Sequence, residues 1–155
     1  MQPQSGTYAL VFISDSDQQI EVGSLGRLHL RPGFYVYVGS AFGPGGLKAR
    51  IVHHMRISRK PHWHMDYLRP ALTLEEIWFT YDCDHREHQW ADVLAGSRSG
   101  TIPFSGFGAS DCRCKSHLTF FDSRPSGASF RRRVHAIFNP HEKIFIKNLL
   151  TKRSE

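Results

Sequence analysis

The sequence predicts an α+β domain in which a small antiparallel sheet is flanked by helices. Two observations favour this class, and the length of the chain indicates a single domain. Short segments of alternating apolar residues are separated by turn residues, which is typical of neighbouring strands. A segment with apolar residues every four positions follows them, as expected for a helix packed on the sheet. The 155 residues suffice for one domain with its own core and are too few for two domains of ordinary size.

The first part of the chain contains the strand signals of an antiparallel meander. Turn residues at 14–17 and at Arg31-Pro32-Gly33 separate the segments. The second and third segments form an extra β-hairpin, inserted between two strands that each carry a tyrosine motif. The predicted strands cover residues 8–13, 19–22, 26–30 and 33–38.

A glycine-rich turn at 41–46 ends this pattern, and a helix over 47–57 is predicted next. Leu47, Ile51 and Met55 recur every four residues and form its apolar stripe. Downstream, the pattern predicts a short helix at 62–68, a strand at 75–81, a helix at 85–95 and a closing strand at 118–121.

The composition shifts after residue 122, where we place the end of the domain. Residues 123–155 form a predicted basic C-terminal tail that is partly helical or flexible. It contains the run Arg131-Arg132-Arg133, which suits contact with a DNA backbone. Apolar residues at 144–146, with Leu149 and Leu150, predict an amphipathic helical segment in this tail.

Charge and cysteine content narrow the class of protein. Lys and Arg outnumber Asp and Glu by 20 to 14, and the net charge of +6 favours polyanionic partners such as nucleic acid. Three cysteines, an odd number, and the lack of a targeting or membrane-spanning run predict a reduced cytoplasmic protein with no membrane contact. The turn Gly43-Pro44-Gly45-Gly46 lacks the Gly-Lys-Ser/Thr ending of a nucleotide-binding loop, which argues against a nucleotide cofactor.

Phenol, guanidinium and imidazole groups are predicted to converge at one place. Tyr37 lies on a strand that stops at Gly39, and the next helix carries Arg50 and His54 one turn apart beside its apolar stripe. Tyr8 lies on an earlier strand, directly after a Gly-Thr pair. A guanidinium matches two phosphate oxygens, so this set of groups suits a phosphate ester.

The same residues resemble the pattern of the GIY-YIG nuclease superfamily. Gly6-Thr7-Tyr8 matches its Gly-x-Tyr strand, Tyr37-Val38-Gly39 its Tyr-x-Gly strand, and the helix with Arg50 and His54 follows in the same order. From residue 6 to about 121 the chain is similar to the small Uri-type endonuclease branch, including the segments 62–68 and 106–118. The resemblance implies an antiparallel sheet with helices packed on it. It also implies hydrolysis of phosphodiester bonds in DNA with one divalent ion, usually Mg²⁺ or Mn²⁺.

The resemblance also implies roles for single residues. Glu87 stands where the superfamily has its metal ligand, on the helix after the third core strand. Tyr8 is expected to act as general base on water, and Tyr37 to position water or phosphate. Arg50 is expected to stabilise the transition state, while His54 suits three roles: orienting a phenol, binding phosphate or transferring a proton. The residues expected to contact substrate are Gly39, Ser40, His62, His64 and Arg113.

Two other functions fit the sequence. A noncatalytic nucleic-acid-binding module would keep the fold and the basic face without turnover. A zinc-stabilised interaction protein would use Cys112, Cys114 and His117, with His62 or His64 as fourth ligand, but Cys-x-Cys is not zinc-ribbon spacing and no second cysteine pair follows. Duplex, flap and single-stranded DNA, and also RNA, all suit the candidate residues, and no protein partner is singled out.

Overall fold

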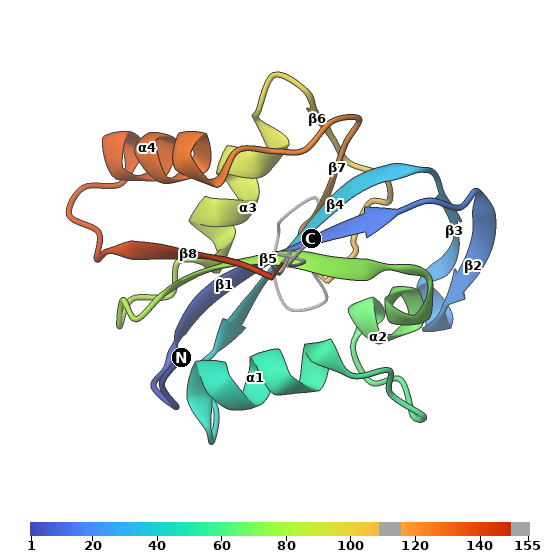
Figure 1. Ribbon diagram of the computed structural model, residues 1–155, viewed down its shortest axis with the longest axis horizontal. Coiled ribbons are helices and arrows are strands. Elements are labelled where there is room, and N and C mark those ends of the chain that lie inside the picture. The colour runs from blue at the N-terminus through green and yellow to red at the C-terminus, as the bar shows by residue number, and fades with distance from the viewer. Residues whose placement is uncertain (109–115, 150–155) are drawn as a thin grey trace, which may run out of the picture.

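The computed structural model describes residues 1–108 and 116–149, which form an α+β fold as predicted (Figure 1). None of the helices in this described part has the length and apolar character needed to cross a membrane. In chain order the strands are β1 (Gly6–Ser14), β2 (Gln18–Val22), β3 (Gly26–Leu30), β4 (Gly33–Ala41), β5 (Thr73–Thr80), β6 (Gly100–Thr101), β7 (Leu118–Phe121) and β8 (Ile144–Asn148). The helices are α1 (Gly46–Met55), α2 (His64–Leu68), α3 (Glu87–Ala95) and α4 (Gly127–Ile137), with short 3-10 turns at Gly23–Leu25 and Arg69–Ala71.

The central sheet has the strand order β6-β7-β4-β1-β5-β8, and every neighbouring pair is antiparallel. β2 and β3 form a separate two-stranded sheet, which confirms the hairpin inserted between the two tyrosine motifs. The predicted meander is wrong, because β1 pairs directly with β4 and the hairpin lies apart from the sheet. The hairpin has three buried apolar residues, Val22, Leu28 and Leu30. They belong to the hydrophobic cluster that contains Tyr8 and Tyr37, and this packing stabilises the hairpin.

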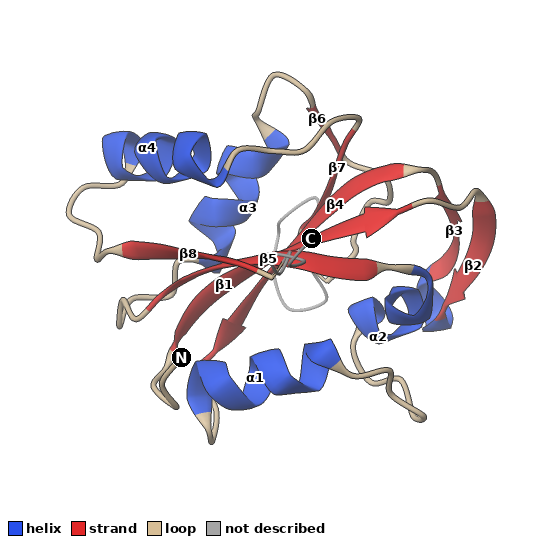
Figure 2. Ribbon diagram, in the orientation of Figure 1, coloured by secondary structure: helices blue, strands red, loops and turns tan. Residues whose placement is uncertain are grey.

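The sheet lies between two helical layers, with α1 and α2 on one face and α3 and α4 on the other (Figures 1 and 2). Because side chains alternate along a strand, β1 supplies both layers. Tyr8 and Leu10 belong to the core under α1 and α2, whereas Ala9 and Val11 belong to the core under α3 and α4. The phenol of Tyr8 therefore faces the layer that also carries Arg50.

The described part of the predicted tail completes the central sheet. Phe130 of α4 stacks on Trp78 of β5 with ring centres 4.9 Å apart, and β8 pairs with β5 along residues 144–148. The predicted amphipathic helix is thus wrong over 144–148. Its alternating aromatic and β-branched residues form a strand because β5 offers an apolar partner edge. The core does not end at the predicted boundary after residue 122.

Candidate active site

A cavity of about 260 Å³ opens where β1, β4 and α1 meet the start of α3 and the segment before α2. Eight of the ten residues singled out from the sequence line it. His54 lies behind Tyr8, and Arg113 lies outside the described residues. The predicted residues that line the cavity are Tyr8, Tyr37, Gly39, Ser40, Arg50, His62, His64 and Glu87.

The two tyrosines reach the cavity because of the register between β1 and β4. Tyr8 pairs with Gly39, and Tyr37 pairs with Leu10, so both phenols project from the same face two residues apart along the sheet. A Cβ atom built on Gly39 would overlap the hydroxyl and the ring of Tyr8. The glycine of the Tyr-x-Gly strand therefore makes room for the phenol of the Gly-x-Tyr strand.

His54 holds the hydroxyl of Tyr8 in a buried hydrogen bond of 3.0 Å between Oη and Nε2. Burial raises the pKa of Tyr8 well above its ordinary value, with a further rise from Tyr37, while the Arg50 guanidinium works in the opposite direction. Burial and the neighbouring His53 lower the pKa of His54 to about 3. At neutral pH the pair is thus a neutral phenol and a neutral imidazole. Of the three roles that the sequence left open for His54, this contact matches the orientation of a phenol.

Arg50 is fixed at the wall of the cavity by two contacts. Its Nη1 donates to the backbone carbonyl of Ser40 over 3.0 Å, and its guanidinium carbon lies 4.4 Å from the ring centre of Trp63. The first contact ties α1 to the end of β4, and the second is a cation–π interaction with the segment before α2. The planar fork is therefore placed before any substrate arrives.

The segment before α2 is shaped by Asp66. Its Oδ2 accepts hydrogen bonds from the backbone amides of His62 and Trp63, and its Oδ1 lies 2.8 Å from Nε2 of His53. Burial acts to raise the pKa of Asp66, but these hydrogen bonds outweigh it and lower the pKa. The carboxylate thus stays charged and links α1 to α2.

His62 and His64 line the same cavity, and the predicted helix over 62–68 is wrong for its first two residues. α2 begins only at His64, so the residues before it are not helical. Nδ1 of His64 accepts the backbone N–H of Gly108 over 2.7 Å, which leaves the ring proton on Nε2. His64 therefore keeps a fixed tautomer.

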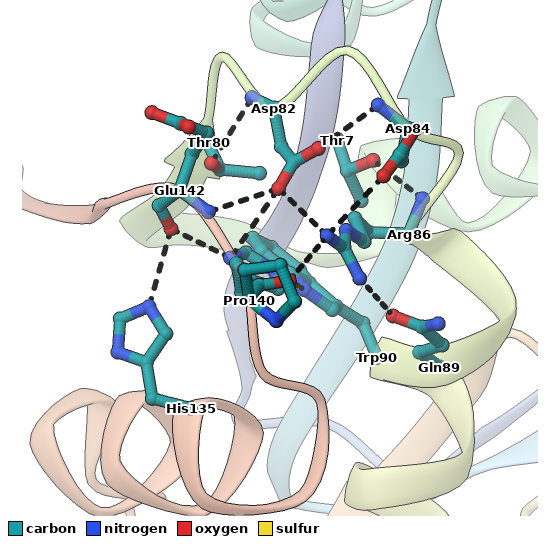
Figure 3. Close-up of polar contacts among 11 residues, drawn as sticks. Thr7, Thr80, Asp82, Asp84, Arg86, Gln89, Trp90, His135, Pro140 and Glu142 are labelled. Atoms are coloured by element: carbon teal, nitrogen blue, oxygen red, sulfur yellow. Dashed lines mark hydrogen bonds and ion pairs between the residues drawn. The ribbon is translucent and has the colours of Figure 1, made fainter.

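Glu87 is the first residue of α3, and its side chain is 21% exposed in the cavity. The residue before it, Arg86, is buried in the polar network drawn in Figure 3. Its guanidinium lies 3.0 Å from a carboxylate oxygen of Asp82 and donates to the carbonyl of Pro140 over 2.8 Å, while its backbone amide donates to Thr7. This network ties the start of α3 to β1 and to the segment before β8. It therefore fixes the position from which Glu87 enters the cavity.

The donor set around Glu87 fits a divalent ion. Mg²⁺ and Mn²⁺ in hydrolytic sites are held by one or two carboxylates and retain several waters, and Glu87 presents a partly exposed carboxylate to the cavity. A second group, His53, His54 and Asp66, also brings its possible ligand atoms within 4.8 Å of one another. The side chains of this second group already have protein partners. Asp66 contacts His53 and two backbone amides, and His54 contacts Tyr8. Cys112 and Cys114, which the sequence offered as zinc ligands only for the alternative function, lie outside the described residues.

Sequence reasoning missed part of the cavity wall. Trp63, His88 and Gly108 were not singled out, and His117 was considered only for zinc. Two signals were available, since Trp63 stands between two candidate histidines and His88 follows Glu87 at the start of a helix. Gly108 lies in the segment 106–118 that the resemblance includes, but no role was assigned to it; its φ is +70°, and it lies against Tyr37 and His117.

Comparison with known proteins gave one family. A family model described as "Domain of unknown function DUF123" matches residues 7–139. No curated protein and no solved structure matched the chain. The matched range runs from the second residue of β1 to just beyond α4, and it includes every residue that lines the cavity.

Proposed function

The chain belongs to the DUF123 family, and we propose that its cavity is the active site of a metal-dependent endonuclease that hydrolyses phosphodiester bonds in DNA. The observation that carries the proposal is the meeting of Tyr8, Arg50 and Glu87, from three separate elements, around one cavity. Hydrolysis of a phosphodiester needs a base for water, cationic groups for the phosphate oxygens and stabilisation of the leaving group. The net charge of +6 supports a polyanionic substrate.

Tyr8 is the proposed general base. Its oxygen takes a proton from the attacking water, which requires the phenolate form. Burial opposes that form, and the positive charge of Arg50 favours it. With its proton on Nε2, the neutral His54 donates to the phenolate oxygen and stabilises it.

Arg50 is proposed to bind the phosphate oxygens in the transition state. One N–H is committed to Ser40, and the planar guanidinium presents further donors in the geometry that a phosphate accepts. Glu87 would hold the divalent ion, which supplies positive charge to the phosphate and the leaving oxygen when bound. Tyr37, whose pKa is raised by burial, stays protonated and can donate a hydrogen bond to phosphate or water.

The pH dependence of cleavage follows from these groups. Because burial raises the pKa of Tyr8, the phenolate fraction increases with pH throughout the neutral range. We expect kcat/KM to rise by up to about tenfold per pH unit between about pH 6 and pH 9. His54, with a pKa of about 3, stays neutral there and adds no inflection. Initial rates at subsaturating DNA and constant ionic strength test this, and an inflection near the ordinary pKa of an imidazole would assign the base to a histidine instead.

The direct test is incubation of the purified chain with labelled nucleic acids. Duplex, flap and single-stranded DNA and single-stranded RNA are each combined with Mg²⁺, Mn²⁺ or a chelator. We expect metal-dependent cleavage of at least one DNA form and none with the chelator. Tight binding of DNA without cleavage under any condition would favour the noncatalytic nucleic-acid-binding module.

A further inference from the structure

His117 lies beside Glu87 on the wall of the cavity. Its Nδ1 is 3.8 Å from Oε2 of Glu87. At metal–ligand distances of about 2.1 Å, two neighbouring ligands of one octahedral ion lie about 3.0 Å apart and two opposite ligands about 4.2 Å apart. The observed separation lies between these two values. One ion can therefore contact both side chains after a side-chain shift of less than about 1 Å.

The backbone holds His117 in this place from two sides. Its amide donates to the carbonyl of Phe107 over 2.7 Å, and its carbonyl accepts from the amide of Val38 over 2.9 Å. The side chain is 5% exposed, so the surrounding protein restricts the positions that its ring can take. A ligand held on a fixed main chain loses little freedom when it binds a metal. His117 therefore presents its imidazole beside Glu87 from a rigid support.

We propose that His117 is a second protein ligand of the divalent ion held by Glu87, and that the site consequently prefers Mn²⁺ to Mg²⁺. The proposal rests on the metal role given to Glu87 in the proposed function. Mg²⁺ is a hard cation that is bound mainly through oxygen, whereas an imidazole nitrogen raises the affinity for first-row transition ions. The sequence predicted either Mg²⁺ or Mn²⁺, and a histidine ligand favours Mn²⁺ of the two.

The first experiment needs no variant. Mn²⁺ is bound to the purified full chain in the absence of nucleic acid, and pulsed electron paramagnetic resonance records its nuclear modulation. We expect modulation from a directly bound histidine ¹⁴N nucleus, and calorimetry should give a Kd for Mn²⁺ at least about tenfold lower than that for Mg²⁺. Bound Mn²⁺ without ¹⁴N modulation, or equal affinity for the two ions, would overturn the proposal.

The second experiment assigns the nitrogen to His117. His117→Gln is expected to abolish the ¹⁴N modulation and to weaken Mn²⁺ binding by about 10–100-fold. It should change the weaker Mg²⁺ binding by less than about threefold, because that ion depends on the Glu87 oxygen. His64→Gln is the matched control, since His64 lines the same cavity but contacts Gly108, and its Mn²⁺ affinity and modulation should be unchanged. If a folded His117→Gln protein kept the wild-type ¹⁴N modulation and Mn²⁺ affinity, the assignment of the nitrogen to His117 would be overturned.

Failure of this proposal can be told apart from failure of the nuclease function. A chain that shows histidine-bound Mn²⁺ but cleaves no nucleic acid supports the ligand pair and contradicts the nuclease. Cleavage with Mn²⁺ in the absence of ¹⁴N modulation contradicts the ligand pair and leaves the nuclease proposal standing. Circular dichroism of the variant confirms its fold, which matters because His117 is buried.

Discussion

Glu87→Gln is expected to lower the rate of metal-dependent DNA cleavage by at least about 10³-fold and to leave DNA affinity within about threefold of the wild type. The substitution keeps the size of the side chain and removes the charge that would anchor the ion. Glu87 is partly exposed at the first position of α3, so the fold should tolerate the amide. Single-turnover cleavage and equilibrium DNA binding, measured on the same preparation, separate the two quantities.

Glu21→Gln is the matched control for this experiment. Glu21 is exposed on the inserted hairpin, where it pairs with Arg27 at 2.9 Å, and exposed pairs of this kind contribute little to stability. Its cleavage rate should equal that of the wild type. Unchanged cleavage by the Glu87 variant would remove this residue from the metal role. A loss of DNA affinity equal to the loss of rate would place Glu87 in substrate binding or folding instead.

Tyr8→Phe is expected to reduce cleavage by about 10²–10⁴-fold, the range in which general bases contribute. The ring keeps its packing under α1, while the oxygen that would accept the proton of water is lost. His54 loses a buried hydrogen-bond partner, which costs about 1–3 kcal/mol of folding stability. The variant should therefore remain folded with a modestly lower Tm, measured by thermal unfolding beside single-turnover cleavage.

Tyr35→Phe provides the comparison that separates packing from catalysis. Tyr35 is as buried as Tyr8, and its hydroxyl accepts from the amide of Arg31 over 2.8 Å, but it does not line the cavity. Loss of the Tyr35 hydroxyl should lower Tm by about as much as Tyr8→Phe does, without lowering the cleavage rate. Equal activity in the Tyr8 and Tyr35 variants, or a collapse of Tm in the Tyr8 variant, would assign Tyr8 a packing role.

Local sequence patterns predicted the elements that carry most of the candidate site. The alternation around Tyr8 and Tyr37 specified two strands, and the repeat of Leu47, Ile51 and Met55 specified the helix with Arg50 on it. These patterns depend on neighbours only a few residues away, because strand and helix periods are properties of the local backbone. The end of α1 was nevertheless predicted two residues too late, since its last turn depends on capping contacts.

Local patterns failed where a long-range partner decides the structure. The short apolar run at 144–146 fits a helix or a strand, and the pairing of residues 144–148 with β5, more than sixty residues earlier, makes this segment β8. The pairing of β1 with β4 in place of β2 has the same origin. The two strands bury apolar side chains on both faces, which the more exposed hairpin strands cannot match.

The sequence alone determined the α+β class, the inserted hairpin and the identity of the phenol, guanidinium and carboxylate groups that are candidates for chemistry. Only the tertiary structure decided that eight of the predicted residues line one cavity, that His54 holds Tyr8, and that His117 and Trp63 share its wall. The physical reason is the distance scale of the interactions. Backbone periodicity acts over a few residues, whereas packing against a common sheet joins side chains as far apart in the sequence as Tyr8 and His117.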